Sequence, residues 1–391
     1  MPRIRLAIVS THPVQYYTPW FRQLAARPEL DSKVFFLWDF GVRERFDPGF
    51  GKTLKWDLPQ LEGYAHEFVR NVASRPGTDH FLGIVNPGLS RRLRAFAPDA
   101  VLLVGYAYPS MLGVMLSPAL RRLPLLLRGD SHHLVPGGRR GWRDAVKLLL
   151  LRRFAAMLAV GSANRRWYRD LGVPDSRIFF SPHAVDAARF ADASHAAEAA
   201  RWRAELGIAV DDTVVLFAGK FESKKRPDLL AEAFRALPGE RLRLVCAGDG
   251  ALRPVLESAA VADGRIRVLP FQNQSRMPAL YALADLVALP SQGPGETWGL
   301  CINEAMSVGR AVLVSDHVGC GPDLVRAGEN GWIVPAGDRA ALRRTLEDAV
   351  SDHSRLRRYG ENSARIIRDY SYSAATDGLM QALAACGAGR R

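Results

Sequence analysis

The chain has 391 residues, and at roughly 150 residues per domain this length favours two domains, with three as an upper bound. Its composition is 48% hydrophobic and 24% charged, which is ordinary for a soluble globular protein with real cores. The longest apolar region, residues 145–160, is interrupted by Lys147, Arg152 and Arg153, which excludes a membrane span there.

The net charge of +13 is unevenly distributed. Residues 1–200 hold 28 Lys and Arg against 17 Asp and Glu, a balance of +11, whereas residues 201–391 hold 25 against 23. A basic half suggests an anionic partner such as a membrane surface, a phosphorylated acceptor or nucleic acid. An arginine-rich solubilising surface explains the excess equally well. We find no recognisable nucleic-acid motif, so no nucleic-acid partner is expected.

The four cysteines lie far apart and show no metal-ligand spacing, so we expect reduced, mostly buried thiols in a reducing compartment: Cys246, Cys301, Cys320 and Cys386. Residues 1–13 contain only a short apolar run, which indicates a first strand and not a signal peptide. We therefore expect a cytoplasmic protein, and the basic half adds the option of a peripheral position at the inner face of the membrane.

Short runs of β-branched residues or leucine alternate with longer helical patterns along the chain. These runs are apolar without strict alternation, as expected for strands covered on both faces, and their alternation with helices predicts parallel sheets of βαβ units. The predicted strands are 4–10, 33–38, 100–105, 123–128, 157–161 and 177–182 in the first half, and 213–219, 242–248, 265–270, 285–291, 311–316 and 331–335 in the second.

A domain boundary is predicted in the alanine-rich, helix-prone region 183–208. It divides the chain into an N-terminal domain, residues 1–190, and a C-terminal domain, residues 191–369. Two doubly wound, Rossmann-like α/β domains would face each other across a cleft, with ligands beyond the carboxyl ends of the strands.

Basic residues follow the first strand of the second half. Lys220 and Lys225 lie in this strand-to-helix loop, at the predicted edge of the cleft. Two ammonium groups there can clamp a diphosphate by neutralising its charge. Taken alone, a solvated loop explains these lysines better.

Two further loops carry weaker signals. Gly248 and Gly250 bracket an aspartate after the next strand, but a tight turn with helix packing explains this pattern better than a phosphate site. Phe271 and Gln272 follow the third strand, where backbone groups can meet a nucleobase. Packing of the aromatic ring on its own helix is at least as good an explanation.

The stretch GPGETWGLCINEAMSVGR turns from glycines and a proline into an apolar helix. We predict that this helix starts at Thr297 or Trp298. Its first amides have no intrahelical acceptor and form an anion site that the helix dipole reinforces, suited to a diphosphate. These amides belong to Thr297, Trp298, Gly299 and Leu300.

Two glutamates flank that anion site. Glu296 lies just outside it, where its carboxylate can accept hydrogen bonds from sugar hydroxyls. Glu304 is eight residues further, about 12 Å along a helix, and suits a ribose at the other end of the diphosphate. The alternatives are a helix N-terminal charge for Glu296 and a surface position for Glu304.

Together these loops resemble the family 4 glycosyltransferases, which have the GT-B fold. The resemblance rests on GKFESKKRPDLL, AGDGALR, YALADLVALPS, ETWGLCINEAMSVGRAVLVSD and ENGWIVPAGD, and spans most of residues 160–350. It implies a retaining transfer of a sugar from a UDP- or GDP-sugar to an acceptor hydroxyl. The sequence shows no DxD-like or His/Cys cluster, so we expect no divalent metal and no other cofactor.

The resemblance also assigns roles in the second half. Lys225 matches a lysine of the family, whereas Lys220 stands where an arginine is usual and would bind the diphosphate without a bidentate fork. Glu296 matches the glutamate on the donor sugar, and Glu304 the one on the ribose. A catalytic role for Glu296 is a hypothesis.

In the family the N-terminal domain carries the acceptor site. His12, Gln15 and Tyr16 follow the first strand, where many members have a glycine-rich loop. They would touch the reacting sugar, the phosphate or the acceptor. A helix cap and hydrophobic staple is the alternative.

A second polar loop of this half is RGDSHH. It contains Arg128, Asp130, His132 and His133, and in the family this loop offers a histidine to the donor sugar. Either Asp130 or His132 holds that place. His183 stands where an asparagine is common.

Two helices complete the prediction. The basic stretch 137–154 is either a packed helix with a charged outer face or a helix on an anionic membrane surface. The last segment, about 370–391, resembles the family's final helix, which crosses back to the first domain. A lipid-linked or cell-surface acceptor, in polysaccharide, lipopolysaccharide or glycolipid synthesis, fits the basic half.

Two other functions fit parts of the pattern. A GT-B sugar-nucleotide epimerase would consume the nucleotide sugar without an acceptor. A basic nucleic-acid-binding protein, a different class, would use the +11 half and show a salt-dependent shift with generic DNA or RNA.

Overall fold

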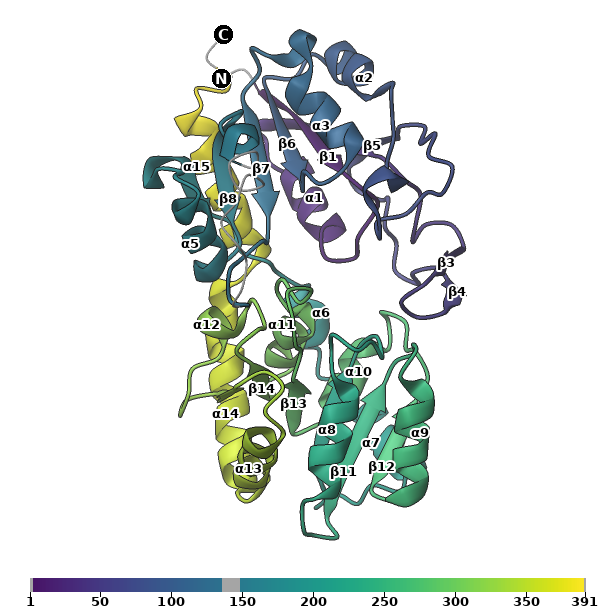
Figure 1. Cartoon of the computed structure of the whole chain (residues 1–391). Coiled ribbons are helices and arrows are strands. Elements are labelled where there is room, and N and C mark those ends of the chain that lie inside the picture. The colour runs from purple at the N-terminus through teal and green to yellow at the C-terminus, as the bar shows by residue number, and fades with distance from the viewer. Residues whose placement is uncertain (1–2, 136–147, 390–391) are drawn as a thin grey trace.

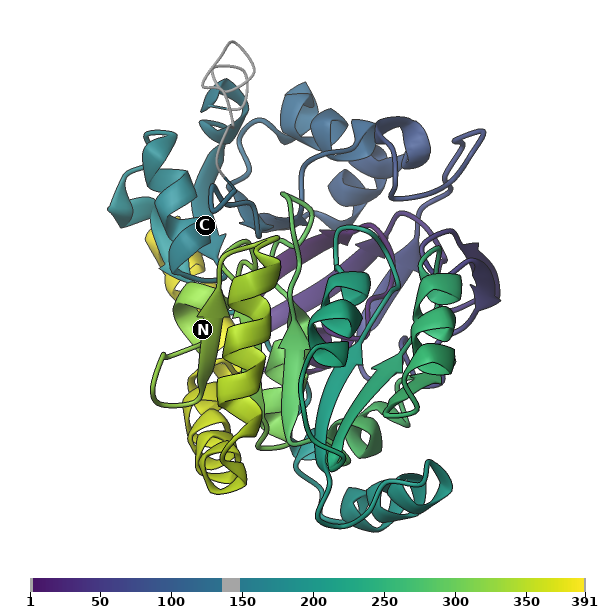
Figure 2. The ribbon, with the colours of Figure 1, turned by 60° about the horizontal axis from the view of Figure 1, so that its bottom comes forward.

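The computed structural model describes residues 3–135 and 148–389 of the chain. The chain forms two lobes, each built on a parallel sheet, with the N-terminal lobe above the C-terminal lobe in Figure 1. In the view of Figure 2 the C-terminal lobe comes forward, and the purple first strands lie behind it.

The sheet of the N-terminal lobe has the strand order β5-β2-β1-β6-β7-β8-β9, with all neighbouring strands parallel. The central strand β1 is apolar because helices cover both of its faces, and its residues Leu6 to Val9 are fully buried. The strands of this sheet are β1 (Ile4–Ser10), β2 (Leu30–Phe36), β5 (Ala65–Phe68), β6 (Ala100–Val104), β7 (Leu125–Gly129), β8 (Phe154–Ala159) and β9 (Ile178–Phe180).

Helices pack on both faces of this sheet. One face is covered by α2, α3 and α5, which contribute Leu93, Met111 and Trp167 to its core. The other face is covered by α1 and by the last helix, α15, which contribute Trp20 and Leu379. The bounds are α1 (Thr18–Ala25), α2 (Leu89–Phe96), α3 (Pro109–Leu116), α5 (Ser162–Asp170) and α15 (Tyr372–Ala385).

The sheet of the C-terminal lobe has the order β12-β11-β10-β13-β14-β15 and is also parallel. Its strands are β10 (Thr213–Ala218), β11 (Leu242–Ala247), β12 (Ile266–Leu269), β13 (Leu286–Leu289), β14 (Ala311–Ser315) and β15 (Gly331–Val334). Its helices are α6 (Ala187–Phe190), α7 (His195–Glu205), α8 (Pro227–Arg235), α9 (Arg253–Ala262), α10 (Met277–Ala282), α11 (Leu300–Ser307), α12 (Gly321–Leu324), α13 (Arg339–Val350) and α14 (His353–Ile366). Two doubly wound sheets therefore face each other, as the sequence predicts.

The chain ends in the lobe where it began. Helix α15 packs against β8, β9 and α1 of the N-terminal lobe. Gly378 permits this close approach, because a Cβ there would lie 1.8 Å from the carbonyl oxygen of Phe180. Trp20 donates from its indole nitrogen to the Thr376 hydroxyl at 3.1 Å. The contact of the final helix agrees with the expected crossing, whereas the boundary at residue 190 stays a prediction.

Three strands escaped the prediction. The edge strand β5 has no fully buried side chain and therefore no apolar run. Strands β3 (Arg45–Asp47) and β4 (Lys52–Leu54) form an antiparallel hairpin that pairs Asp47 with Lys52. Figure 1 shows this hairpin at the edge of the N-terminal lobe, next to the C-terminal lobe. Residues 136–147 of the predicted basic helix lie outside the described residues.

Candidate active site

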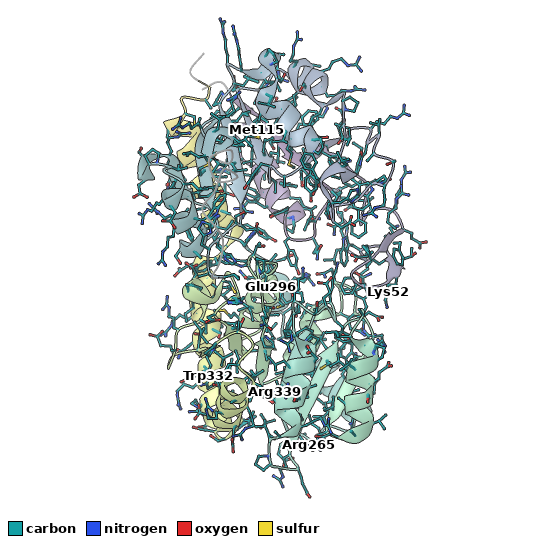
Figure 3. All side chains as sticks on the ribbon, viewed as in Figure 1. Lys52, Met115, Arg265, Glu296, Trp332 and Arg339 are labelled. Atoms are coloured by element: carbon teal, nitrogen blue, oxygen red, sulfur yellow. The ribbon has the colours of Figure 1, made fainter. Side chains whose placement is uncertain are left out.

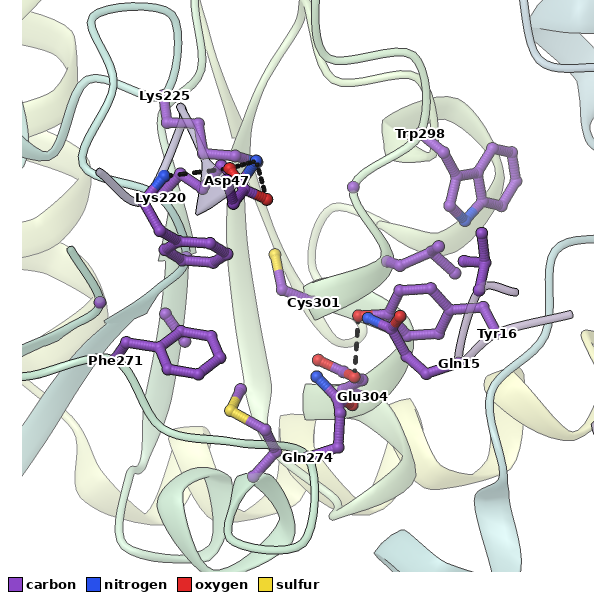
Figure 4. A pocket seen from close by; sticks show the side chains of 18 of the residues that line it. Gln15, Tyr16, Asp47, Lys220, Lys225, Phe271, Gln274, Trp298, Cys301 and Glu304 are labelled. Atoms are coloured by element: carbon purple, nitrogen blue, oxygen red, sulfur yellow. Dashed lines mark hydrogen bonds and ion pairs between the residues drawn. The ribbon is translucent and has the colours of Figure 1, made fainter. Parts of the chain in front are cut away.

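A cavity of about 490 Å³ lies between the lobes, beyond the carboxyl ends of both sheets. Figure 3 shows Glu296 at the level between the lobes, whereas Arg265 and Trp332 lie deeper in the C-terminal lobe. The cavity brings together many of the predicted residues (Figure 4). They are His12, Gln15, Tyr16, Asp130, Lys220, Lys225, Phe271, Gln272, Glu296, Thr297, Trp298, Gly299, Leu300 and Glu304.

Lys225 and Glu296 form an ion pair within the C-terminal wall. The Lys225 ammonium lies 2.5 Å from Glu296 Oε2, which also accepts a hydrogen bond from the Ser291 hydroxyl at 3.1 Å. Burial opposes the charge on Lys225, but Glu296 outweighs this effect and raises the pKa of the lysine. Both charges are therefore held in place before any ligand binds.

Lys220 instead has a partner in the opposite lobe. Its ammonium lies 2.8 Å and 3.1 Å from the two carboxylate oxygens of Asp47, in hairpin β3–β4. The same ammonium lies 4.9 Å from the centre of the Phe50 ring. An ion pair thus spans the cleft at the place predicted for a diphosphate (Figure 4).

The N-terminus of α11 differs in register from the predicted anion site, because the helix begins at Leu300 and not at Thr297 or Trp298. Gly299 has φ 98°, and a Cβ there would lie 2.9 Å from the side chains of Leu289 and Val318. This left-handed residue delays the start of the helix. The amides of Gly299, Leu300 and Cys301 therefore precede the first backbone bond of the helix, in which Ile302 donates to the Gly299 carbonyl.

The two residues before Gly299 serve the cleft through their side chains. The Thr297 hydroxyl donates to Asp130 Oδ2 at 2.8 Å, which links the lobes. The buried Trp298 indole donates to Asn303 Oδ1 at 2.8 Å and packs against His183 at 5.4 Å between ring centres. These contacts fix the loop that precedes the helix.

Glu304 is buried, with 1% of its surface exposed, so the surface alternative for it is wrong. Its Oε1 accepts from the Tyr16 hydroxyl at 3.1 Å and its Oε2 from the Tyr281 hydroxyl at 2.7 Å. Burial raises the pKa of Glu304 to about 7, although both hydroxyls act in the opposite direction. Neutral hydroxyls of this kind are also what a ribose offers to a carboxylate.

Asp130 faces the cavity beside Thr297. Burial alone would raise its pKa, but His183 and the Thr297 hydroxyl lower it overall. His183 Nε2 lies 3.7 Å from Asp130 Oδ2, and its Nδ1 accepts from Arg128 at 3.4 Å. Asp130 is therefore an ionised carboxylate at neutral pH, ready to accept hydrogen bonds in the cleft.

His132 and Arg128 are predicted to lie in the cleft, but in the structure they do not line the cavity. His132 Nδ1 accepts from the Leu134 amide, so its Nε2 carries the proton and donates to the Glu296 carbonyl at 3.3 Å. The His132 ring therefore supports the loop that carries Glu296 from outside the cavity. Arg128 is buried under Trp20 and donates to the Pro182 carbonyl at 2.7 Å, because it lies on the covered part of β7.

The other predicted residues of the N-terminal wall are uncharged. Burial lowers the pKa of His12 to about 4, and Asp47 offsets only part of this effect. The His12 ring makes edge contacts with Phe40 at 5.3 Å and Trp38 at 5.9 Å. Gln15 lines the same wall (Figure 4).

Phe271 and Gln272 lie at the end of the cavity near hairpin β3–β4. Phe271 packs edge-on against Phe50, 4.6 Å away, so its aromatic contact is with the opposite lobe and not only with its own helix. The Gln272 amide donates to the Pro270 carbonyl at 2.9 Å. A flat aromatic ring is thus available at this end of the cleft.

Several cavity residues escaped the sequence analysis. Asp47 and Phe50 have no motif around them, and only the structure brings them to the lysines. Tyr281 lies in a segment that carries the family resemblance, so that segment is the signal that could have found it. Cys301 follows Leu300 at the N-terminus of α11, and burial raises the pKa of its thiol to about 12.

The described residues form neither a metal-binding cluster nor a membrane-spanning helix. In residues 3–135 and 148–389, no group of three or more His, Cys, Asp and Glu side chains could hold a metal ion. Within the same residues, no helix combines the length and the apolar character that crossing a membrane requires.

Two facing Rossmann-like domains with a shared cleft define the GT-B fold, and solved structures agree. HepE from Anabaena, crystallised with UDP and glucose, matches with a TM-score of 0.73 and 18% identity over 98% of this chain and 100% of its own. Sucrose-phosphate synthase from Thermosynechococcus elongatus matches with a TM-score of 0.70 and 20% identity over 97% of this chain and 98% of its own.

Residues 198–366 match the model of the family "Glycosyl transferases group 1". D-inositol 3-phosphate glycosyltransferase from Nocardia farcinica is 34% identical over 55% of this chain and 49% of its own length. The enzyme of the same name from Xylanimonas cellulosilytica is 31% identical over 59% of this chain and 57% of its own length. The chain thus matches about half the length of these curated relatives.

Proposed function

We propose that this protein is a retaining glycosyltransferase that moves a sugar from a nucleotide diphosphate sugar to an acceptor hydroxyl. The observation that carries the proposal is one arrangement in the cleft. A helix N-terminus, the ammonium groups of Lys220 and Lys225 and the carboxylates of Glu296 and Glu304 are among the groups that converge on the same cavity. The family of the C-terminal half supports this assignment.

The donor's diphosphate would lie against the N-terminal amides of α11, next to Lys220 and Lys225. These groups would stabilise the negative charge that develops on the leaving diphosphate, where preorganised donors have their largest effect on rate. Glu304 would accept hydrogen bonds from the ribose in place of the tyrosine hydroxyls. Glu296 would position the donor sugar.

The anomeric configuration of the sugar would be retained because the acceptor hydroxyl attacks the same face of the sugar from which the diphosphate leaves. The carboxylate of Glu296 is committed to Lys225 and Ser291, which suits a positioning group better than a nucleophile. The leaving phosphate would then take the proton of the acceptor hydroxyl. The ammonium groups and amides would balance the phosphate charge, so we propose transfer without a divalent cation.

The acceptor would enter along the N-terminal wall, past His12 and Asp130. We propose a carbohydrate or lipid-linked acceptor of polysaccharide, lipopolysaccharide or glycolipid synthesis. The charge balance of +11 over residues 1–200 supports an anionic acceptor or an anionic membrane surface. Curated relatives are named for D-inositol 3-phosphate, which makes a phosphorylated polyol the first acceptor to test.

Thermal shifts with UDP, GDP, ADP and CMP, each with and without EDTA, test the donor site. Selective stabilisation by one diphosphate, unchanged by EDTA, supports a metal-free site and names the base. The absence of any shift would contradict the proposal. Nucleotide-sugar consumption with and without acceptors then separates transfer from epimerisation, because only transfer requires an acceptor.

A further inference from the structure

Hairpin β3–β4 and the residues after it reach from the N-terminal lobe onto the C-terminal lobe. Lys52 forms an ion pair with Asp249 at 2.7 Å, in the loop after β11. The Asp57 carboxylate accepts from the Ser275 amide at 3.1 Å. We call residues 45–57 the cleft hairpin. These two contacts lie beside the cavity, so the hairpin covers one end of the cleft.

Within the cleft hairpin, Asp47 is the residue that contacts Lys220. It is 6% exposed, and its Oδ1 accepts from the amides of Gly49 and Phe50 at 2.8 Å and 3.1 Å. These bonds aim the carboxylate at Lys220, which contacts both of its oxygens. A negative group with two oxygens thus occupies the position on Lys220 that a phosphate would use.

The two lysines of the cleft differ in this respect. Lys225 pairs with Glu296 of its own lobe, which the proposed function keeps in the loaded site as a positioning group. Lys220 pairs with a carboxylate from the other lobe, which has no such role. A diphosphate and Asp47 would share one ammonium, and their mutual repulsion favours exchange of one for the other.

The ribose carboxylate shows a parallel arrangement. Glu304 accepts from Tyr16, a residue of the N-terminal lobe, at 3.1 Å. The neutral Tyr16 hydroxyl therefore hydrogen-bonds to the Glu304 carboxylate, just as the Asp47 carboxylate pairs with the Lys220 ammonium. The N-terminal lobe thus contributes one partner to each kind of group: Asp47 to the ammonium of Lys220 and Tyr16 to the carboxylate of Glu304.

We infer that Asp47 holds the phosphate position on Lys220 and that the donor diphosphate must displace it, so that Asp47 determines donor affinity. This inference rests on the proposed function. It assigns a donor-site role to a residue of the N-terminal lobe. Donor binding then exchanges an ion pair between the lobes for an ion pair with the ligand.

The test compares Asp47→Asn with the unmodified protein by titration calorimetry with UDP and with GDP. Asparagine keeps the Oδ1 that accepts from Gly49 and Phe50, so the hairpin retains its turn while the charge is removed. We expect Asp47→Asn to bind the preferred diphosphate about 3- to 10-fold more tightly, the range for loss of a partly exposed competing ion pair. Unchanged or weaker binding would overturn the inference and leave the proposed function standing.

Two further variants complete the design. Asp39→Asn is the matched control, since Asp39 pairs with Arg43 and Arg45 outside the cavity and should leave affinity unchanged. In a Lys220→Met background, Asp47→Asn should give no gain, and a persisting gain would show that Asp47 does not act through Lys220. If neither UDP nor GDP binds any variant, the donor site itself is wrong, and the inference fails with it.

Discussion

The two walls of the cleft are built in different ways. The C-terminal wall is formed by short loops directly after strands and by a helix N-terminus, and it presents the ammonium groups of Lys220, Lys224 and Lys225. The N-terminal wall is formed by longer loops and a hairpin, and apart from Asp47 and Asp130 its residues are uncharged there, with His12 and Tyr16 as examples. A fixed cationic wall suits a donor that always carries a diphosphate, whereas a neutral, loop-built wall can be adapted to different acceptors.

The largest loss of activity is expected from a substitution in the C-terminal wall. Glu296→Ala should lower kcat about 100- to 1,000-fold, because it removes the carboxylate proposed to position the donor sugar and leaves the Lys225 ammonium without its partner. Steady-state kinetics measures the loss, and circular dichroism checks the fold. Glu329→Ala, at an exposed ion pair with Arg326, is the control and should keep normal turnover. Unchanged turnover of Glu296→Ala would contradict the assigned role.

The two lysines sharpen the comparison within that wall. Lys225→Met should weaken UDP or GDP binding by ~10- to 100-fold, since it also leaves the buried Glu296 carboxylate without its ion-pair partner. Lys220→Met should weaken binding by less, ~3- to 10-fold, because Asp47 already offsets that lysine. Calorimetric Kd values for both variants decide the order. The reverse order would show that Lys220 carries the main diphosphate contact.

Glu304 predicts a pH dependence of stability. Its pKa is raised from the ordinary 4.5 to about 7, so the folded state binds a proton that the unfolded state releases. Between these values the free energy of unfolding should therefore fall as pH rises. Glu304→Gln should raise Tm at pH 8 by about 2–4 °C, with a smaller gain at pH 5. Calorimetric scans at both values test this, and an equal gain at both would refute the raised pKa.

The smallest effect is expected on the acceptor wall. With a pKa of about 4, His12 is neutral from pH 5 to 8, so His12→Gln should leave the shape of the pH–rate profile unchanged over this range. A change in acceptor KM of up to about 10-fold is compatible with a contact residue. Loss of an ionisation from the profile would instead make His12 a proton-transfer group.

The sequence predicts most of the molecule for a physical reason. Strands such as β10 and β13 are buried on both faces, so their apolar runs are visible without neighbours, and the loops after them carry the lysines and glutamates. Hairpin β3–β4 has no such run, and Asp47 meets Lys220 only through the packing of two domains. Arg128 was misplaced because a pattern does not tell which face of a strand the cleft uses. The start of α11 was misplaced because Gly299 adopts a positive φ.

The return of the chain to its first lobe restricts how the lobes can move. The backbone passes between the lobes twice, once between β9 and α6 and once between α14 and α15. A body held at one point can swivel in every direction, but a body held at two points rotates about the line that joins them. A relative rotation of the two lobes would therefore be easiest about the line that joins the two crossings.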